Sequence, residues 1–205
     1  MEKIAAIFGS GGHARVVASI LKANRIHYLG FFDDSYRREN DEEIAGAPLI
    51  GRFKDILRFA KKVDRVYLAS GNNKVRQKHF RFLRSNRFLL PAAVHPCALL
   101  EKNATVGEGS VVCMGAILCA QANVGKGCIV NTGSSLDHEA ALGDFSHLAP
   151  KTVVAGRTSI GKRVFVGIHA VVADRLKIGD DVTIGAGAIV LKNVPDNTKV
   201  LGVWH

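Results

Sequence analysis

Cysteine is scarce in this chain of 205 residues: it occurs only at Cys97, Cys113, Cys119 and Cys128, and no two of these have Cys-x-x-Cys spacing. A disulfide framework or a zinc site is therefore not indicated, and a reducing cytoplasm is the expected compartment. No segment approaches the ~20 consecutive apolar residues that cross a membrane. The chain also starts without the features of a secretory leader, since residues 1–8 run directly into a glycine turn.

Hydrophobic residues make up 47% of the chain and charged residues 22%, values typical of a globular protein with a buried core. The net charge of +10 is unevenly distributed: residues 1–90 hold 18 Lys and Arg against 9 Asp and Glu, whereas residues 91–205 hold 10 against 9. A basic first half suits nucleic acid, anionic lipid or a phosphorylated small molecule, and charge alone leaves these partners open.

The second half contains a strict repeat of six residues. An aliphatic residue occupies every sixth position without exception, at Val94, Leu100, Val106, Val112, Leu118, Val124, Val130, Leu136, Leu142, Leu148, Val154, Ile160, Val166, Val172, Ile178, Ile184 and Val190. A period of six matches neither a helix nor a long strand, but it matches a short strand followed by a turn. Three such units make one triangular coil, and stacked coils bury a continuous aliphatic interior. The sequence therefore predicts a parallel β-helix.

This pattern resembles that of the hexapeptide-repeat acyltransferases, and the resemblance extends over residues 94–195. It implies a left-handed coil, acyl transfer from acetyl-CoA, and a homotrimer whose active sites lie between neighbouring prisms.

Strands and helices are expected to alternate in the first ninety residues. Strands are expected over residues 3–8, 27–32 and 65–69, and helices after the glycine turn, over 52–62 and over 74–87. Such alternation predicts a small parallel α/β sheet, the Rossmann-like half of a dinucleotide fold. The expected domains are residues 1–90 and 91–205. Ninety residues leave no room for the second half that a complete dehydrogenase needs.

The turn after the first strand reads Gly9-x-Gly11-x-x-Ala14, and an acidic residue follows about twenty positions later. This is the spacing of the dinucleotide-binding fingerprint, in which glycines let the backbone approach a ligand and the helix start favours a phosphate. The alternative is a glycine turn that serves only to pack the strand against the helix.

Several motifs together resemble the bacterial nucleotide-sugar acetyltransferases of the PglD type, a group that includes sialic-acid O-acetyltransferases and perosamine N-acetyltransferases. The motifs are residues 8–13 (FGSGGH), 32–34 (FDD), 70–76 (SGNNKVR), 131–132 (NT), 137–139 (DHE) and 143–147 (GDFSH). The resemblance implies that the first domain binds the nucleotide-sugar through Gly11, Gly12, His13, Asp33, Asp34, Gly71 and Asn72.

His138 is the candidate general base, because acetyl transfer to an amine or hydroxyl requires a group that accepts the proton. It lies two positions after Leu136, off the interior of the coil, between Asp137 and Glu139. A carboxylate bonded to one ring nitrogen would fix the tautomer and stabilise the imidazolium. The resemblance likewise makes His138 the base and Glu139 the residue that orients it.

The resemblance also implies the acetyl-CoA site. His147 would contact the thioester region at the trimer interface, the amide of Gly156 would stabilise the oxyanion, and Ile168 and Ala186 would lie near the pantetheine arm. Nine residues separate His147 from His138, half of an eighteen-residue coil, so the two should project from different parts of the prism. The cysteines of the repeats are expected to be packing residues, and no metal is expected.

The segment with Lys74, Arg76, Lys78, Arg81, Arg84 and Arg87 is interpreted as a solvated helix face with a buried apolar stripe rather than as a nucleic-acid site. It leaves room for a peripheral membrane contact. The expected function is N-acetylation of the 4-amino group of a nucleotide-linked amino-dideoxysugar. The alternatives are O-acetylation of a sialic acid and a non-catalytic trimeric scaffold.

Overall fold

The computed structural model describes residues 4–37 and 42–205. The chain divides into two compact units, Met1–Pro96 and Cys97–His205, each with its own core. Lys3, where the first strand was expected to begin, lies outside the described residues. Within the described part of the chain, no helix is both long enough and apolar enough to cross a membrane.

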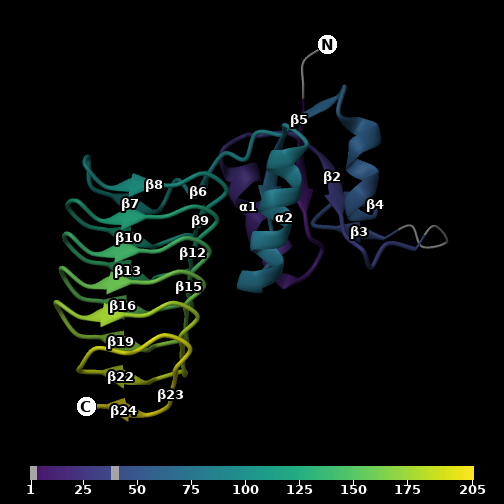
Figure 1. The fold of residues 1–205 in the computed structure, drawn as a ribbon. Coiled ribbons are helices and arrows are strands. Elements are labelled where there is room, and N and C mark those ends of the chain that lie inside the picture. Colours follow the sequence, from purple (N-terminus) through teal and green to yellow (C-terminus); the bar gives the residue numbers. More distant parts are fainter. Residues whose placement is uncertain (1–3, 38–41) are drawn as a thin grey trace. The chain divides into compact units, whose positions relative to one another are not determined.

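The first unit is an α/β module (Figure 1). Its elements are β1 (Ile4–Phe8), α1 (Gly12–Ala23), β2 (Tyr28–Phe32), β3 (Glu43–Ile44), β4 (Ala47–Gly51), η1 (Phe53–Phe59), β5 (Val63–Leu68), α2 (Asn73–Ser85) and β6 (Ala93–Val94). Five strands form one sheet in the order β3-β4-β2-β1-β5. Strands β1, β2, β4 and β5 are parallel, and β3 is antiparallel to β4.

Two expectations for this unit were wrong. The sheet is mixed rather than purely parallel, because β3 and β4 form a tight hairpin whose two central residues, Ala45 and Gly46, both have positive φ. The segment 52–62 contains a 3-10 helix of 7 residues instead of an α-helix. The Asp55 carboxylate accepts a hydrogen bond from the Arg52 amide at its start, and β5 begins only four residues after Phe59, which leaves little length for α-helical turns.

The order of the strands fixes where ligands can approach the sheet. Strand β1 lies between β2 and β5, and the chain crosses first to β2 on one side and later to β5 on the other. In open parallel sheets, the crevice at such a reversal, beyond the carboxyl ends of the strands, is where ligands bind. The turns that follow β1, β2 and β5 therefore form the candidate binding edge of this unit.

The second unit is a parallel β-helix built from strands of two residues, stacked coil on coil (Figure 1). The strands are β7 (Leu99–Leu100), β8 (Thr105–Val106), β9 (Val111–Val112), β10 (Ile117–Leu118), β11 (Asn123–Val124), β12 (Ile129–Val130), β13 (Ser135–Leu136), β14 (Ala141–Leu142), β15 (His147–Leu148), β16 (Val153–Val154), β17 (Ser159–Ile160), β18 (Phe165–Val166), β19 (Val171–Val172), β20 (Lys177–Ile178), β21 (Thr183–Ile184), β22 (Ile189–Val190), β23 (Lys199–Val200) and β24 (Val203–Trp204).

These strands make three sheets along the stacked coils, and the sheet that begins at β8 ends at β20 while the other two continue to β23 and β24. The sheets run β24-β22-β19-β16-β13-β10-β7, β20-β17-β14-β11-β8 and β23-β21-β18-β15-β12-β9. From β7 to β22, paired residues in neighbouring coils are 18 positions apart, as in the pairing of Ile117 with Ser135. The predicted coil of three six-residue units is confirmed, and the predicted left-handed fold class is borne out.

The aliphatic repeat supplies the core of this unit. Each aliphatic residue is the second residue of its strand, and every one from Val112 to Val190 is buried. The first residue of most strands is exposed or half-buried, but Val111, Ile129 and His147, which begin β9, β12 and β15, are buried. The period ends after Val190, since the next buried aliphatic of a full strand is Val200, ten positions later.

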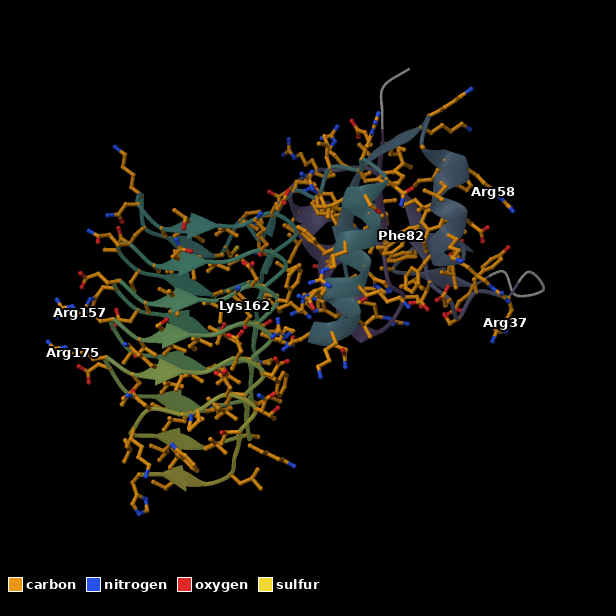
Figure 2. All side chains as sticks on the ribbon, viewed as in Figure 1. Arg37, Arg58, Phe82, Arg157, Lys162 and Arg175 are labelled. Atoms are coloured by element: carbon orange, nitrogen blue, oxygen red, sulfur yellow. The ribbon has the colours of Figure 1, made fainter. Side chains whose placement is uncertain are left out.

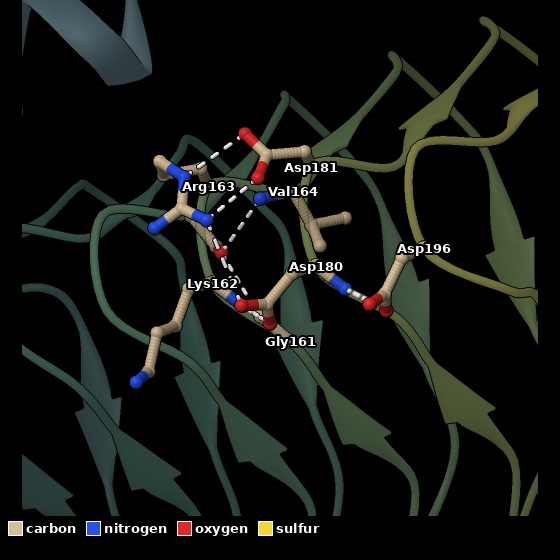
Figure 3. Close-up of polar contacts among 8 residues, drawn as sticks. Gly161, Lys162, Arg163, Val164, Asp180, Asp181 and Asp196 are labelled. Atoms are coloured by element: carbon tan, nitrogen blue, oxygen red, sulfur yellow. Dashed lines mark hydrogen bonds and ion pairs between the residues drawn. The ribbon is translucent and has the colours of Figure 1, made fainter.

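Polar side chains connect successive coils at the corners. In Figure 3 the Arg163 guanidinium forms two hydrogen bonds to the Asp181 carboxylate one coil away, at 2.9 Å from Nε and 2.6 Å from Nη2. The Asp180 carboxylate accepts from the Lys162 amide, and the Asp196 carboxylate accepts from the Asp180 amide. Corner amides that the sheets leave without a partner are satisfied in this way.

Candidate functional site

Three neighbouring turns of the first unit carry all the residues expected to bind the nucleotide-sugar. Gly11, Gly12 and His13 follow β1, Asp33 and Asp34 follow β2, and Gly71 and Asn72 follow β5. Because these strands are adjacent and parallel, their turns share one edge of the sheet. The structure thus brings the whole expected set to one edge.

Asp33 holds two of these turns together. Its Oδ2 accepts a hydrogen bond from the Ser10 amide at 2.8 Å, and its Oδ1 accepts one from the Ser35 amide at 2.9 Å. Both carboxylate oxygens therefore shape the glycine turn and the Asp turn. Asp34 is exposed, which leaves its carboxylate available to a ligand.

The glycines at this edge leave space above the backbone. A Cβ atom added to Gly11, Gly12 or Gly71 would meet no heavy atom within 4 Å. Gly11 caps the start of α1 without a side-chain hydrogen bond. An anion can therefore approach the first amides of α1 closely, as the fingerprint spacing predicted. Beside them, burial and the Arg76 charge lower the pKa of His13 to about 4, so this ring is neutral at pH 7.

Arg76 shapes the turn after β5, and it corrects the interpretation of α2 as an apolar stripe with a fully solvated basic face. Its side chain is completely buried. Nη1 donates hydrogen bonds to the carbonyls of Ser70 and Gly71 at 3.0 Å each, and Nη2 donates to Asn73 Oδ1 at 2.8 Å. Asn72 caps α2 by accepting from the Val75 amide. The loop 70–73 is therefore held by the guanidinium and the cap.

A cavity of about 310 Å³ opens beside these turns, lined by Phe8, Asp34, Arg52, Phe53, Lys54, Asp55, Lys78, His79 and Phe82. Its aromatic members pack on one another: the Phe53 ring lies 4.4 Å from Phe8 and 4.0 Å from His79, centroid to centroid. His79 is fixed by Ser70 Oγ, 2.9 Å from its Nδ1. Burial lowers the pKa of His79, and the carboxylates of Asp33 and Asp34 oppose that shift.

The cavity combines aromatic surface with three cationic side chains, Arg52, Lys54 and Lys78. Such a lining suits a planar ring that carries anionic groups. Of its residues, only Asp34 was singled out from the sequence as a ligand-binding residue. Lys78 was noted in the sequence only as part of the basic segment 74–87, and Arg52 and Lys54 only through the basic excess of the first ninety residues.

His138 lies at a corner of the β-helix, just after β13, with half of its side chain exposed. Its Nδ1 is 3.3 Å from Glu139 Oε2, and its amide donates to Asp137 Oδ1 at 2.7 Å. An ionised carboxylate can only accept, so Nδ1 is the donor and, in the neutral ring, Nε2 keeps the lone pair. This is the arrangement of a general base oriented by an acid.

Gly156 lies one coil beyond His138, directly beneath its ring. A Cβ atom on Gly156 would stand 2.5 Å from both Cε1 and Nε2 of His138, so only glycine leaves room for the imidazole here. The Gly156 backbone is buried, and its carbonyl accepts from the Arg175 amide. The structure therefore places Gly156 against the Nε2 edge of the ring.

His147 belongs to a different sheet, in β15. Its ring is buried, its Nε2 is 3.2 Å from Asn131 Nδ2, and it packs edge-on against Phe165 with 5.2 Å between centroids. Asn131 was noted in the sequence only as part of a motif and was given no role. His138 lies at the corner after β13 and His147 lies in β15, so the two histidines occupy different parts of the prism, as their nine-residue spacing predicted.

Ile168 and Ala186 lie together at another corner of the prism. Both are exposed, and they are stacked one coil apart, where the Gly187 amide donates to the Ile168 carbonyl. They follow β18 and β21, whereas His138 and Gly156 follow β13 and β16. Within one chain, the expected base and the expected pantetheine contacts are therefore at different corners.

The three cysteines of the repeats, Cys113, Cys119 and Cys128, are not set up as nucleophiles. Cys113 and Cys128 are buried, and burial raises the pKa of the Cys113 thiol to about 12. Burial, followed by a hydrogen bond to Asp137, also raises the pKa of Cys119. A thiolate is the reactive form, so these shifts oppose covalent catalysis. Among the residues that the structure describes, no three His, Cys, Asp or Glu side chains cluster to hold a metal ion.

Two protein-family models match the chain. The PglD N-terminal domain matches residues 4–83, and the bacterial transferase hexapeptide model, described as six repeats, matches residues 157–192. The two matches fall in the two structural units.

Solved structures of similar proteins cover nearly the whole chain. The acetyltransferase domain of PglB from Neisseria gonorrhoeae is 31% identical with a TM-score of 0.89, covering 97% of this chain and 96% of that one. A histidine-to-alanine variant of GDP-perosamine N-acetyltransferase from Caulobacter crescentus, in complex with CoA and GDP-perosamine, is 32% identical with a TM-score of 0.93, covering 97% and 93%.

A curated relative from Bacillus subtilis is described as UDP-N-acetylbacillosamine N-acetyltransferase. It is 31% identical over 115 residues, which are 54% of this chain. The match spans about half of that relative, 51% of its length.

Proposed function

Since the chain belongs to the family of PglD-type sugar acetyltransferases with hexapeptide repeats, we propose that it transfers an acetyl group from acetyl-CoA to the 4-amino group of a nucleotide-linked amino-dideoxysugar. The observation that carries the proposal is the His138–Glu139 pair, with its Nδ1–Oε2 distance of 3.3 Å and its ring over Gly156. The similar perosamine enzyme, solved with CoA and GDP-perosamine, supports the substrate class.

In this proposal, the first unit binds the nucleotide part of the acceptor. The open glycine turns accept phosphate oxygens at the start of α1, and Arg52, Lys54 and Lys78 add positive charge to the adjoining cavity. The aromatic rings of Phe53 and Phe82, which are half-buried, offer faces on which a base can pack. Gly71 and Asn72 complete the edge on the β5 side.

His138 is the proposed catalytic base. Its Nε2 accepts a proton from the acceptor amine as the nitrogen attacks the thioester carbonyl, and Glu139 stabilises the imidazolium through Nδ1–H. The C–N bond forms while the C–S bond breaks, and the proton held by His138 is available to the departing thiolate. The Gly156 amide lies beside the ring, where it can donate to the carbonyl oxygen.

We also propose that the active enzyme is a homotrimer. The outward residues of the sheet from β7 to β24 include Leu99, Ile117, Val153, Val171, Ile189 and Val203, all of them exposed. One exposed aliphatic residue in nearly every coil makes an apolar face that a second copy would cover. Packing of copies would also let the His138 corner of one chain meet the Ile168 corner of another, which a single chain does not achieve.

The test is thiol release from acetyl-CoA with UDP-, GDP- and dTDP-linked 4-amino-4,6-dideoxysugars and with free sialic acid. We expect turnover with one nucleotide-linked amine and a loss of kcat of about 10²- to 10⁴-fold in His138→Ala. His27→Ala, which removes an exposed histidine of the first unit, is the control and should retain kcat.

If free sialic acid were the only acceptor acetylated, the substrate would be a sialic acid and the reaction would be an O-acetylation. Absence of acetyl-CoA binding by calorimetry would overturn acyl transfer and favour a non-catalytic scaffold. Size-exclusion chromatography with light scattering tests the trimer, since a monomeric, fully active protein would contradict it.

A further inference from the structure

The corner that carries Glu139 also carries an arginine one coil further on. Arg157 follows Glu139 by 18 residues, and both have left-handed backbone conformations, with φ of 58° and 57°. The Arg157 amide donates to the His138 carbonyl at 2.9 Å, so the two corners are in register. Figure 2 shows Arg157 and Arg175 projecting from this corner of the β-helix in successive coils.

The Arg157 side chain reaches the same oxygen that His138 uses. Its Nε donates to Glu139 Oε2 at 2.7 Å, and His138 Nδ1 lies 3.3 Å from that same Oε2. One carboxylate oxygen therefore accepts from both groups. The shorter, charge-assisted bond comes from Arg157, so the position of Glu139 depends more on Arg157 than on the histidine.

The charge of Arg157 also acts on the carboxylate. The hydrogen bond from Arg157, followed by that from His138, lowers the pKa of Glu139. An ionised Glu139 can only accept, which keeps the Nδ1 proton on His138 and the lone pair on Nε2. The other charged group against this pair is Asp137, which accepts from the His138 amide and is hydrogen-bonded to Cys119.

Two other corner arginines show that this contact is not a general feature of the coil. Arg175 occupies the same corner one coil further on, but its Nε lies 3.7 Å from the Asp174 carboxylate, a sequence neighbour. Arg163 pairs with Asp181 across one coil, using two hydrogen bonds. Arg157 instead donates to Glu139 Oε2, the oxygen that also lies 3.3 Å from His138 Nδ1.

We propose that Arg157 is a positioning residue that acts on the base His138 through Glu139, by holding the carboxylate ionised and in place against Nδ1. This role rests on the proposed function, in which His138 is the base. It predicts that the contribution of Arg157 to turnover exists only while Glu139 is present.

The kinetic test is a double-mutant cycle with the full-length protein. Arg157→Ala should lower kcat about five- to tenfold, the size expected for the loss of one half-exposed hydrogen bond, with both KM values within twofold of wild type. Arg157→Lys should recover part of that loss, and Arg175→Ala should leave kcat unchanged. In a Glu139→Ala background, Arg157→Ala should cause no further loss.

The second measurement does not depend on turnover. In ¹⁵N spectra of the imidazole rings, with His138 assigned by its absence in His138→Asn, the neutral ring should carry its proton on Nδ1 in wild type. Arg157→Ala should shift a clear fraction to the Nε2–H tautomer, and Arg175→Ala should not.

The outcomes separate the two proposals. A wild type that acetylates no acceptor refutes the proposed function, and the tautomer in Arg157→Ala still decides the role of Arg157. Equal losses of kcat with and without Glu139, or an unchanged tautomer in Arg157→Ala, would show that Arg157 is only a contact between coils and would overturn the inference.

Discussion

The two units of this protein have different kinds of interior. The β-helix buries Val, Leu and Ile at equivalent positions of successive coils, so each contributes much as its neighbours do. The α/β unit buries individual polar side chains that have no equivalent elsewhere, such as Arg76 beneath the loop 70–73 and His79 against Ser70. Regular packing makes a stable support, whereas single polar contacts give each loop its own shape. In the β-helix the candidate chemistry accordingly lies at the corners, where the repeat allows variation.

From this difference between the two interiors, we expect the largest loss of stability at Arg76. Arg76→Ala removes the donor to two buried-loop carbonyls and leaves a cavity, so the free energy of unfolding of the first unit should fall by about 4 kcal/mol. Circular dichroism at 222 nm in a urea titration measures this, because the described α-helices, α1 and α2, both belong to that unit.

Arg81→Ala is the matched control, since Arg81 is an exposed arginine of the same helix. It should change the free energy by no more than about 0.5 kcal/mol. If the two variants lost similar amounts of unfolding free energy, the loop 70–73 would not depend on the buried guanidinium. The contrast between the two interiors would then not hold for the α/β unit.

In the β-helix, by contrast, the same substitution at equivalent positions should cost the same unfolding free energy. Leu118→Ala and Leu148→Ala each remove a fully buried side chain from the second position of a strand, and each should cost about 3 kcal/mol. We expect the two losses to agree within about 1 kcal/mol, because the positions repeat. Emission of the single tryptophan, Trp204, reports on this unit during unfolding in urea.

A loss of unfolding free energy below about 1 kcal/mol at either leucine would contradict the equivalence of the repeat positions. It would indicate that the coil at that position collapses around the missing side chain, which a stack of identical layers should resist.

This contrast explains how much the sequence could predict. The period of six identified the aliphatic core because the same position of successive repeats lies in the same buried environment. The glycine turns and acidic residues of the first unit were placed correctly at the ends of β1, β2 and β5, since their motifs follow strands. Arg76 was misread as a surface charge, because nothing local distinguishes a basic residue that turns inward from Arg81. The link from Arg157 to Glu139 depends on a separation of 18 residues and on side-chain direction, which residue types do not specify.

Acid should weaken the first unit before it weakens the second. Burial and the Arg76 charge lower the pKa of His13 from 6.5 to about 4, and burial also lowers that of His79. Between pH 6.5 and 4 the unfolded chain therefore binds more protons than the folded one, and stability falls as pH falls. We expect a loss of about 1–2 kcal/mol from His13 between pH 7.5 and 5, with allowance for its partial exposure.

Urea titrations at the two pH values, followed at 222 nm, measure this loss, and His13→Asn should reduce it. The transition seen by Trp204 emission is the internal comparison. An equal shift of both transitions, or one that persists in full in His13→Asn, would place the sensitive group elsewhere.

The smallest effect is expected at the corner ion pair of Figure 3. Arg163 and Asp181 join two coils through two hydrogen bonds, yet about a fifth of each side chain remains exposed, at 22% and 23%. The Coulomb attraction is therefore partly screened, and a double-mutant cycle with Arg163→Met and Asp181→Asn should give a coupling of about 1 kcal/mol or less. Because a screened pair responds to ionic strength whereas aliphatic packing does not weaken in salt, the coupling should shrink in 1 M sodium chloride while the cost of Leu148→Ala persists. A coupling of several kcal/mol that is insensitive to salt would mean that the corners, and not the aliphatic interior, hold the coils together.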